Sequence, residues 1–195
     1  MRLASPYDSF HDPYCYKNSF VLKNRAGLRD AIALERLEGE LSTYRVQELL
    51  PSGRFDPKHY RAVHHHLFQD IYNWAGRYRT VRTAKDGAMF CYPEFIASQM
   101  DALFQAILKE PFVGGAPQAD FVRAATRFLG DLNAIHPFRD GNGRTQLSFL
   151  FLLGARAGYP LDMSRIRAEP MLTAMVESFQ GRLGPLEAEI GWLCR

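Results

Sequence analysis

The sequence contains few cysteines and no long hydrophobic run, and both absences restrict the class of protein. Its three cysteines are too few and too widely spaced for a disulfide framework or a CxxC metal site, which favours a protein of the reducing cytoplasm. The longest apolar run, over 147–155, is interrupted by a serine and a glycine and is too short to span a bilayer. We therefore expect no membrane partner.

A targeting segment and an excess of charge are also missing. The first ten residues, MRLASPYDSF, contain neither an apolar stretch nor a small-residue cleavage site, so we expect no secretory signal. The 24 basic and 21 acidic residues leave a net charge of only +3, so we expect no direct nucleic-acid partner. The pI of about 8.8 instead suits a small anionic ligand.

What the sequence does contain is typical of one α-helical domain over 1–195. The chain is long enough to bury a core, and its apolar residues recur at helical spacing between turns rich in glycine and proline. This spacing predicts helices over about 28–50, 57–74, 93–108, 118–135, 144–157, 171–179 and 186–194. An irregular N-terminal arm, 1–26, would be anchored by its aromatic residues Tyr7, Phe10, Tyr14, Tyr16 and Phe20.

One segment, 78–92, has the pattern of a β-hairpin. Residues that favour strands, at 80–83 and 88–92, flank Lys85-Asp86-Gly87. An Asp-Gly pair between such segments predicts a hairpin, here with three residues between the strands. Because two strands alone are marginally stable, we expect the hairpin to lie against the helices or against a partner.

The loop 136–144, HPFRDGNGR, lies between two predicted helices and concentrates groups that bind phosphates, metal ions and protons. Its two glycines can adopt positive φ angles, and the loop opens into a helix whose first N–H groups can converge on an anion. Arg144, in the first helical turn, opposes the helix dipole unless an anion lies beside it. Asp140 can hold Mg²⁺ together with phosphates, and His136 can accept a proton from a hydroxyl. The loop therefore predicts a nucleoside triphosphate site.

Competing interpretations of these residues are weaker. Asp-Gly-Asn-Gly is also a good turn and helix cap, and a single histidine near a helix end is often structural, but here the two features coincide within nine residues. The loop also begins a GxGxxG pattern, yet Gln146 occupies the third glycine position and a helix precedes it. His64-His65-His66 would point to different faces of a helix, so we expect a structural or surface role there in place of a metal site.

Together these residues resemble a known family. His136-Pro-Phe138-Arg-Asp140-Gly-Asn-Gly-Arg144 is similar to the Fic-domain signature, His-x-Phe-x-Asp/Glu-Gly-Asn-Gly-Arg-x-x-Arg. The segments DPYCYKNSFVLKN, LFQDIYNWAG and DGAMFCYP also resemble the arm, helix and flap of bacterial stand-alone Fic proteins. The resemblance implies the Fic fold, an all-α domain with one β-hairpin flap. It also implies a protein adenylyltransferase, which transfers AMP from ATP to a Ser, Thr or Tyr hydroxyl of a target protein and releases pyrophosphate.

Carried over by position, the resemblance assigns a role to each residue of the loop. His136 would be the catalytic base, Asp140 would hold Mg²⁺, and Phe138 would anchor the loop in the core. The nucleotide phosphates would be bound by Gly141, Asn142, Gly143 and Arg144. A target segment would pair with the main chain of the flap residues Thr83, Ala84, Lys85, Asp86, Gly87, Ala88 and Met89.

Leu147 departs from the family signature. It replaces the final arginine, which in the family reaches the γ-phosphate and, in inhibited forms, binds a glutamate of an inhibitory helix. The inhibitory pattern Ser/Thr-x-x-x-Glu-Gly/Asn is not matched either, since Leu34 precedes Glu38-Gly39 at the Ser/Thr position. We therefore expect either low intrinsic activity or restraint by a separate small protein, as in toxin–antitoxin pairs. Leu147 also leaves alternatives open: another donor, removal of AMP from a modified protein, or a weakly active partner-binding module.

Overall fold

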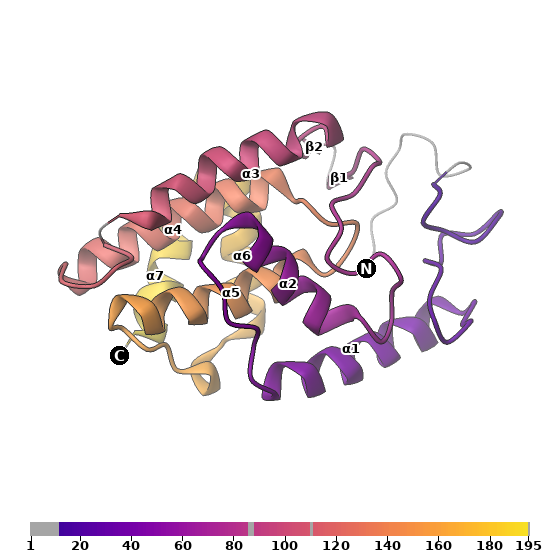
Figure 1. Cartoon of the computed structure of the whole chain (residues 1–195), viewed down its shortest axis with the longest axis horizontal. Coiled ribbons are helices and arrows are strands. Elements are labelled where there is room, and N and C mark those ends of the chain that lie inside the picture. Colours follow the sequence, from indigo (N-terminus) through magenta and orange to yellow (C-terminus); the bar gives the residue numbers. More distant parts are fainter. Residues whose placement is uncertain (1–11, 86–87, 110, 195) are drawn as a thin grey trace.

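The computed structural model describes residues 12–85, 88–109 and 111–194, and over these residues the chain is mostly helical (Figure 1). The α-helices are α1 (Ala31–Gln47), α2 (Pro57–Phe68), α3 (Ile96–Gln105), α4 (Gln118–Ile135), α5 (Asn142–Ala157), α6 (Ala168–Phe179) and α7 (Gly184–Leu193). Short 3₁₀ helices are η1 (Pro93–Phe95), η2 (Ala106–Leu108) and η3 (Met163–Arg165). The strands β1 (Ala84–Lys85) and β2 (Ala88–Met89) form an antiparallel hairpin. The predicted all-α architecture with one hairpin is confirmed.

Most predicted helices form close to the predicted bounds, and local signals explain their ends. Helix α2 begins at Pro57 as predicted, after Asp56 accepts a hydrogen bond from the His59 N–H at 2.7 Å. Its predicted extension to Trp74 is wrong, since α2 ends at Phe68. The N–H groups of Ile71 and Tyr72 both turn back to the Phe68 carbonyl, as expected for a segment rich in turn-forming Asp and Asn.

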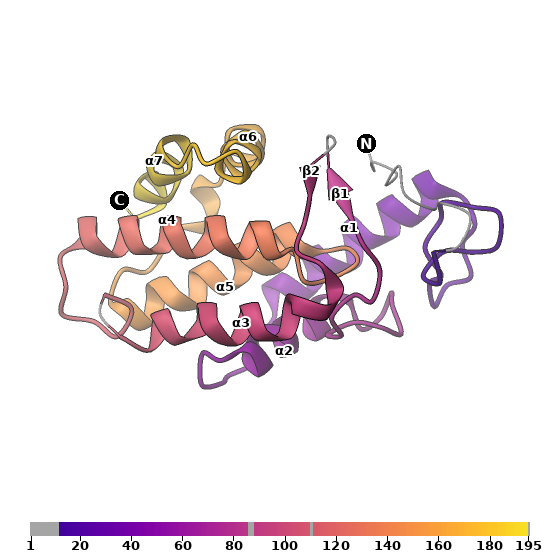
Figure 2. The same cartoon turned by 90° about the horizontal axis from the view of Figure 1, so that it is seen from above.

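The helices pack in layers around α4 and α5. In Figure 2, α6 and α7 lie on one side of α4, while α2 and α3 lie on the opposite side. The hairpin stands beside the end of α4 in the same view, where the chain turns towards α5. The 136–144 loop therefore lies at a junction of α4, α5 and the hairpin.

Aromatic rings form the centre of the core beneath this junction. The Tyr60 ring of α2 lies 5.5 Å from the Phe138 ring and 5.3 Å from the Phe149 ring of α5. Phe104 of α3 packs against Phe149 at 5.5 Å. Phe138 has no exposed surface, so the predicted burial of this loop residue is confirmed.

The N-terminal arm is anchored by only part of the predicted aromatic set. Tyr14 packs edge-on against Trp74 at 5.6 Å, and Tyr16 packs against the core. Phe20 is 65% exposed, so its predicted role as an anchor is wrong. The neighbouring Leu22 is buried instead, because the arm folds back on itself through a bridge between Cys15 and Leu22. Tyr7 and Phe10 lie outside the described residues.

The hairpin is shorter than predicted, and fewer residues separate its strands. Ala84 pairs with Met89 and Lys85 pairs with Ala88, so Lys85 belongs to a strand and the predicted three-residue loop is wrong. The Phe90 N–H extends the pairing to the Thr83 carbonyl at 3.1 Å. Asp86 and Gly87 lie outside the described residues. Residues 78–83 and 90–92 lie outside the strands, because several of their backbone groups bond to other parts of the molecule.

Candidate active site

Asn142 closes the loop between α4 and α5. The Phe138 N–H donates to the Asn142 side-chain oxygen at 3.0 Å, and the Asn142 amide nitrogen donates back to the Phe138 carbonyl at 2.8 Å. Both side chains are buried, and the Phe138 ring packs between Tyr60 and the imidazole of His64. The predicted phosphate-binding residue Asn142 therefore directs its side chain into the loop and shapes it from within.

Gly141 allows the loop to enter α5. Its φ angle is 78°, and a Cβ atom at this position would overlap the ring of Phe68. The first hydrogen bond of α5 runs from the Thr145 N–H to the Gly141 carbonyl at 3.1 Å. The N–H groups of residues 142–144 precede this bond and lie at the helix N-terminus, where the partial positive charge favours an anion. Gly143 is exposed there.

Asp140 is partly exposed beside these N–H groups, and hydrogen bonds hold both its carboxylate and its carbonyl. Its carboxylate accepts a hydrogen bond from the Gly141 N–H at 2.7 Å. Its carbonyl lies 3.0 Å from Nε2 of His64, whose Nδ1 accepts from the Gly76 N–H at 2.8 Å. Because Nδ1 is an acceptor, Nε2 carries the hydrogen and donates it to Asp140. Burial lowers the pKa of His64 to about 3, so the ring remains neutral.

The prediction of a structural role for the histidine run 64–66 can be compared with its contacts. His65 Nδ1 lies 3.1 Å from the Ala75 carbonyl, and His66 Nε2 lies 2.9 Å from the Arg45 carbonyl. The three rings contact different parts of the fold, so the expected structural role is confirmed. Among the described residues, no three His, Cys, Asp or Glu side chains gather into a metal site.

Arg144 is paired with a carboxylate of α1. Its guanidinium forms an ion pair with Glu38, donates to the Ser42 hydroxyl at 2.8 Å, and lies 4.7 Å above the Phe68 ring. Glu38 is only 3% exposed and also accepts a hydrogen bond from the Tyr72 hydroxyl. The anion that Arg144 requires near the helix N-terminus is therefore supplied, in this structure, by the protein itself.

His136 lies at the opposite side of the loop and stacks on the hairpin. It follows the last residue of α4 in the left-handed conformation, with a φ angle of 48° that non-glycine residues seldom adopt. Its ring lies 3.9 Å from that of Phe90, and the two planes are nearly parallel at 12°. The hairpin and the histidine thus share a direct contact.

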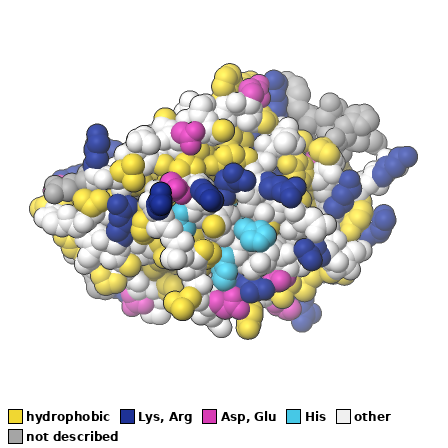
Figure 3. Space-filling view, in the orientation of Figure 1, with side chains coloured by type: hydrophobic (Ala, Val, Ile, Leu, Met, Phe, Trp, Pro, Cys, Tyr) yellow, Lys and Arg dark blue, Asp and Glu magenta, His cyan; other side chains and the backbone are white. Residues whose placement is uncertain are grey.

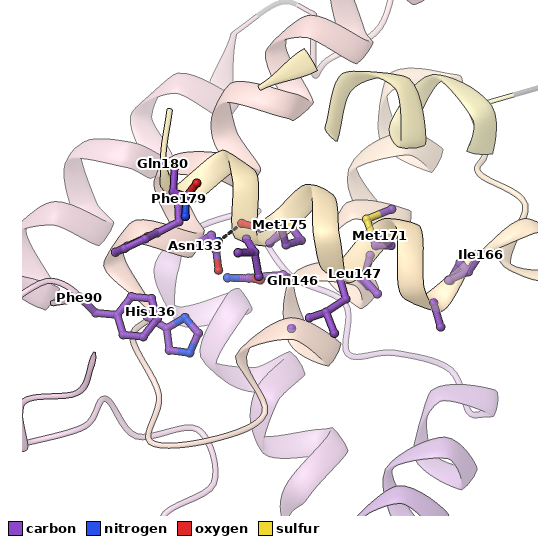
Figure 4. Close-up of a pocket in the computed structure, with 14 residues that line it drawn as sticks. Phe90, Asn133, His136, Gln146, Leu147, Ile166, Met171, Met175, Phe179 and Gln180 are labelled. Carbon is purple, nitrogen blue, oxygen red and sulfur yellow. Dashed lines mark hydrogen bonds between the residues drawn. The ribbon is translucent and has the colours of Figure 1, made fainter. Parts of the chain in front are cut away.

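A cavity of about 370 Å³ opens beside His136 (Figure 4). Its polar groups come from α4, from the start of α5 and from the end of α6, and Figure 4 shows Asn133 and Gln146 close together between His136 and Leu147. Its apolar wall comes mostly from α6. The lining residues are Phe90, Asn133, His136, Gly143, Gln146, Leu147, Ile166, Ala168, Met171, Leu172, Met175, Val176, Phe179 and Gln180.

Comparisons with known proteins identify the family. A model of the Fic/DOC family matches residues 54–153, a range that includes the whole loop. The chain belongs to the Fic/DOC family. It is 45% identical over 185 residues to "Probable protein adenylyltransferase y4lH" of Sinorhizobium fredii, covering 94% of this chain and 96% of that protein. It is also 36% identical to "Protein adenylyltransferase VbhT" of Bartonella schoenbuchensis, covering 94% of this chain but only 39% of VbhT.

A solved Fic structure supports the same fold. The N-terminal Fic domain of a VirB-translocated Bep effector protein from Bartonella quintana, crystallised with bound ADP, superposes with a TM-score of 0.80. The two sequences are 30% identical, and the match covers 92% of this chain and 93% of that one. The predicted Fic fold is therefore confirmed.

Leu147 occupies the last signature position of this Fic chain and lines the cavity. It is partly buried and packs against the core. None of the cavity-lining residues is a lysine or an arginine. None of the helices among the described residues has the length and apolar character to cross a bilayer.

Three residues of this Fic site were missed by the sequence analysis: Glu38, His64 and Phe90. The helical stripe of α1 was expected to be apolar, yet the residues that it buries are Leu34, Glu38 and Ser42. An acidic residue at an inward position is a signal that it has a partner. His64 gave a similar signal, because it adjoins the buried stripe of Val63 and Leu67.

Proposed function

We propose that this chain is a protein adenylyltransferase that transfers AMP from ATP to a Ser, Thr or Tyr hydroxyl of a target protein and releases pyrophosphate. The observation that carries the proposal is the arrangement around one loop. The cavity, the N-terminus of α5 and the His136 imidazole meet there. Both curated relatives described above are named adenylyltransferases, and the Bartonella quintana domain binds ADP.

The cavity suits the nucleoside part of the donor. Its wall is apolar and it lacks cationic side chains, which fits an uncharged base and ribose better than a polyphosphate. Gln146 is 1% exposed, and its Nε2 makes no hydrogen bond within the described residues. A buried donor of this kind gains from a ligand acceptor, so we assign it to the nucleoside.

The phosphates would then lie at the N-terminus of α5, over the N–H groups of residues 142–144. Arg144 would contact them from the side. Its three contacts in α1 use Nη1 and Nη2, and a guanidinium carries five N–H donors, so donors remain for a phosphate. A row of Lys and Arg side chains crosses the middle of the face shown in Figure 3, which would attract an anionic nucleotide.

Asp140 fits the requirements of a magnesium ion. Mg²⁺ usually takes only one or two protein carboxylates and completes its shell with phosphate oxygens and water. The partly exposed Asp140 carboxylate beside the α5 N-terminus suits this pattern, and no larger group of ligands is needed. When bound, the ion would neutralise charge on the α- and β-phosphates.

His136 would act as the catalytic base. It would take the proton from the target hydroxyl as that oxygen forms a bond to the α-phosphorus. The bond from the α-phosphorus to the oxygen bridging to the β-phosphorus breaks, and pyrophosphate leaves with both electrons of that bond. A base of this type contributes on the order of 10²–10⁴-fold to the rate.

The hairpin would serve as the flap that aligns the target. Within the described residues its sheet has only two strands, so an extended peptide can pair along an edge. Of the predicted flap residues, Thr83 precedes β1, and Ala84, Lys85, Ala88 and Met89 form the strands. Main-chain pairing would set the position of the target hydroxyl with little demand on side-chain identity.

The test is transfer of label from two forms of ATP to proteins of a bacterial lysate. Label at the α-phosphate should appear on a protein, whereas label at the γ-phosphate should not. His136→Ala should abolish this labelling but keep ATP binding, and the exposed His65→Ala should retain both. Transfer of the γ-label, or equal labelling by His136→Ala, would contradict the proposal.

The presence of Leu147 at the last signature position favours a second group of candidate functions. Leu147 supplies no charge where the Fic signature has an arginine that reaches a triphosphate, which suits a different donor, removal of AMP from a modified protein, or a weakly active binding module. Intact-mass measurement after incubation with ATP and Mg²⁺ separates these outcomes by the adduct formed. We further propose a cytoplasmic bacterial protein restrained by a small antitoxin, which co-purification of the full chain with products of neighbouring genes would test.

A further inference from the structure

Arg79 is the only arginine among the described residues that is almost fully buried, with 2% of its surface exposed. Within those residues no carboxylate forms an ion pair with it, and its guanidinium instead donates to backbone carbonyls. Burial lowers its pKa to about 10, which leaves it charged at neutral pH. A buried charge held by carbonyl groups alone requires an explanation.

The carbonyls come from two places that matter to the proposed reaction. Two belong to the end of α4: Nε donates to the His136 carbonyl at 2.8 Å, and Nη2 donates to the Ile135 carbonyl at 3.1 Å. The other two flank the flap: Val81 precedes β1 and accepts at 2.8 Å, and Cys91 follows β2 and accepts at 2.6 Å. One side chain therefore joins both ends of the hairpin to the histidine.

Electrostatics explain why a cation is stable at this position. The last carbonyls of an α-helix have no partner within the helix and carry the negative end of its dipole. Arg79 satisfies such carbonyls at the end of α4, and its own N–H donates to the Pro137 carbonyl at 2.9 Å. Arg79 thus binds the carbonyls of Ile135 and Pro137, the residues on either side of His136, and so holds His136 in its unusual left-handed conformation.

Further contacts link the same elements. The Cys91 N–H donates to the Ala134 carbonyl of α4 at 3.1 Å, and the Phe90 ring stacks on the His136 ring. Phe90, which follows β2, therefore holds the ring of His136, and Arg79 holds its backbone carbonyl. A movement of the flap that breaks these contacts would also move the base.

We propose that Arg79 is a positioning residue for the transfer reaction. It holds the two ends of the flap and the backbone of His136 as one hydrogen-bonded unit, so that a hydroxyl presented on the flap meets the imidazole at a set distance. This inference rests on the proposed function of the site. The inference goes beyond the proposed function, because it assigns the coupling between target docking and the catalytic base to one side chain outside the 136–144 loop.

Arg79→Lys tests the inference, with Arg61→Lys as the matched control. Lysine keeps the charge, but its single nitrogen cannot reach four carbonyls arranged around a planar fork. Arg61 also donates to a backbone carbonyl, that of Gly76 at 2.8 Å, and stacks over Tyr78, but both of these residues precede Arg79 in the chain and lie outside the segment 81–91 that Arg79 holds. Thermal unfolding of each variant sets an assay temperature at which all are folded.

We expect Arg79→Lys to lose AMP transfer but to keep its affinity for the nucleotide. Because misplacement of reacting groups by about 1 Å can cost on the order of 10²-fold, we expect Arg79→Lys to lower labelling of the main acceptor protein about 10- to 100-fold. ATP affinity should stay within about twofold, and Arg61→Lys should match the wild type in both. Equal labelling by folded Arg79→Lys would overturn the inference.

A second measurement does not depend on transfer. The imidazole nitrogens of His136, followed by NMR over a pH titration, should change resonance and titration midpoint in Arg79→Lys but not in Arg61→Lys. An unchanged His136 titration would overturn the inference even if labelling fell. If the wild type itself labels no protein while the His136 titration responds to Arg79→Lys, the proposed function fails and the positioning role stands.

Discussion

Glu38 and Arg144 lie 106 positions apart in the sequence and form an ion pair at the N-terminus of α5. Arg144 belongs to the predicted phosphate-binding loop, whereas Glu38 belongs to α1. The buried Glu38 carboxylate therefore accepts from an N–H donor of the guanidinium that a nucleotide would also use. In the proposed site, Glu38 would compete with phosphate for Arg144 and would limit how tightly ATP binds.

Glu38→Gln should change stability and nucleotide affinity in opposite directions. Loss of the charge-assisted hydrogen bonds should lower the free energy of unfolding by about 1–3 kcal/mol. Removing a negative charge next to Arg144 should strengthen ATP binding about three- to tenfold, as expected for an interaction on the order of 1 kcal/mol. Urea unfolding and calorimetric titration with ATP measure the two effects. The control Glu40→Gln, whose ion pair with Arg36 is exposed, should change neither, and unchanged ATP affinity in Glu38→Gln would contradict the competition.

Leu147→Arg should raise the turnover of ATP. It restores the cation of the Fic signature beside the cavity, and a charged hydrogen bond to phosphate contributes roughly 1.5–3 kcal/mol. We expect turnover at limiting ATP to rise about tenfold or more, measured as release of pyrophosphate. Leu147→Met keeps the apolar volume and should behave like the wild type. Equal turnover by Leu147→Arg would mean that this position does not limit the reaction.

Gly141→Ala and Gly143→Ala should differ in stability although they lie two residues apart. Alanine at 141 must adopt a φ angle of 78° and overlap the ring of Phe68, which should lower the free energy of unfolding by about 1–3 kcal/mol. A Cβ atom at 143 meets nothing within 4 Å, and alanine favours the helix, so Gly143→Ala should be equally or slightly more stable. Equal losses in thermal unfolding would contradict the described loop geometry.

His64 should make the stability of the protein depend on pH. Its pKa falls from 6.5 to about 3 on folding, so between these values the unfolded chain binds a proton that the folded chain does not. This contribution to stability is fully present above pH 6.5 and decreases as the pH falls towards 3, by about 1.4 kcal/mol for each pH unit. Urea unfolding of the wild type and His64→Gln between pH 7 and 5 measures the difference in slope. The exposed His65→Gln should keep the wild-type slope, and an equal slope in His64→Gln would refute the assignment.

Local patterns in the sequence predicted the helices well where one face is apolar throughout. Helix α4 has the predicted bounds 118–135, because Phe121, Ala125 and Phe128 recur at helical spacing and all are buried. Prediction was poorer where tertiary contacts compete with local preference. The segment 80–83 favours strands, yet the Val81 carbonyl accepts from Arg79 instead of from the opposite strand.

The sequence by itself determined the helical class, the loop with its histidine, carboxylate and glycines, and hence the Fic family, because these depend on residues close together along the chain. Only the tertiary structure decided what surrounds that loop. It pairs Arg144 with Glu38, directs His64 to the Asp140 carbonyl and joins Arg79 to both the flap and His136. The Arg144–Glu38, His64–Asp140 and Arg79–His136 contacts join residues 57 to 106 positions apart, and no local periodicity encodes them, because they arise only when whole helices pack.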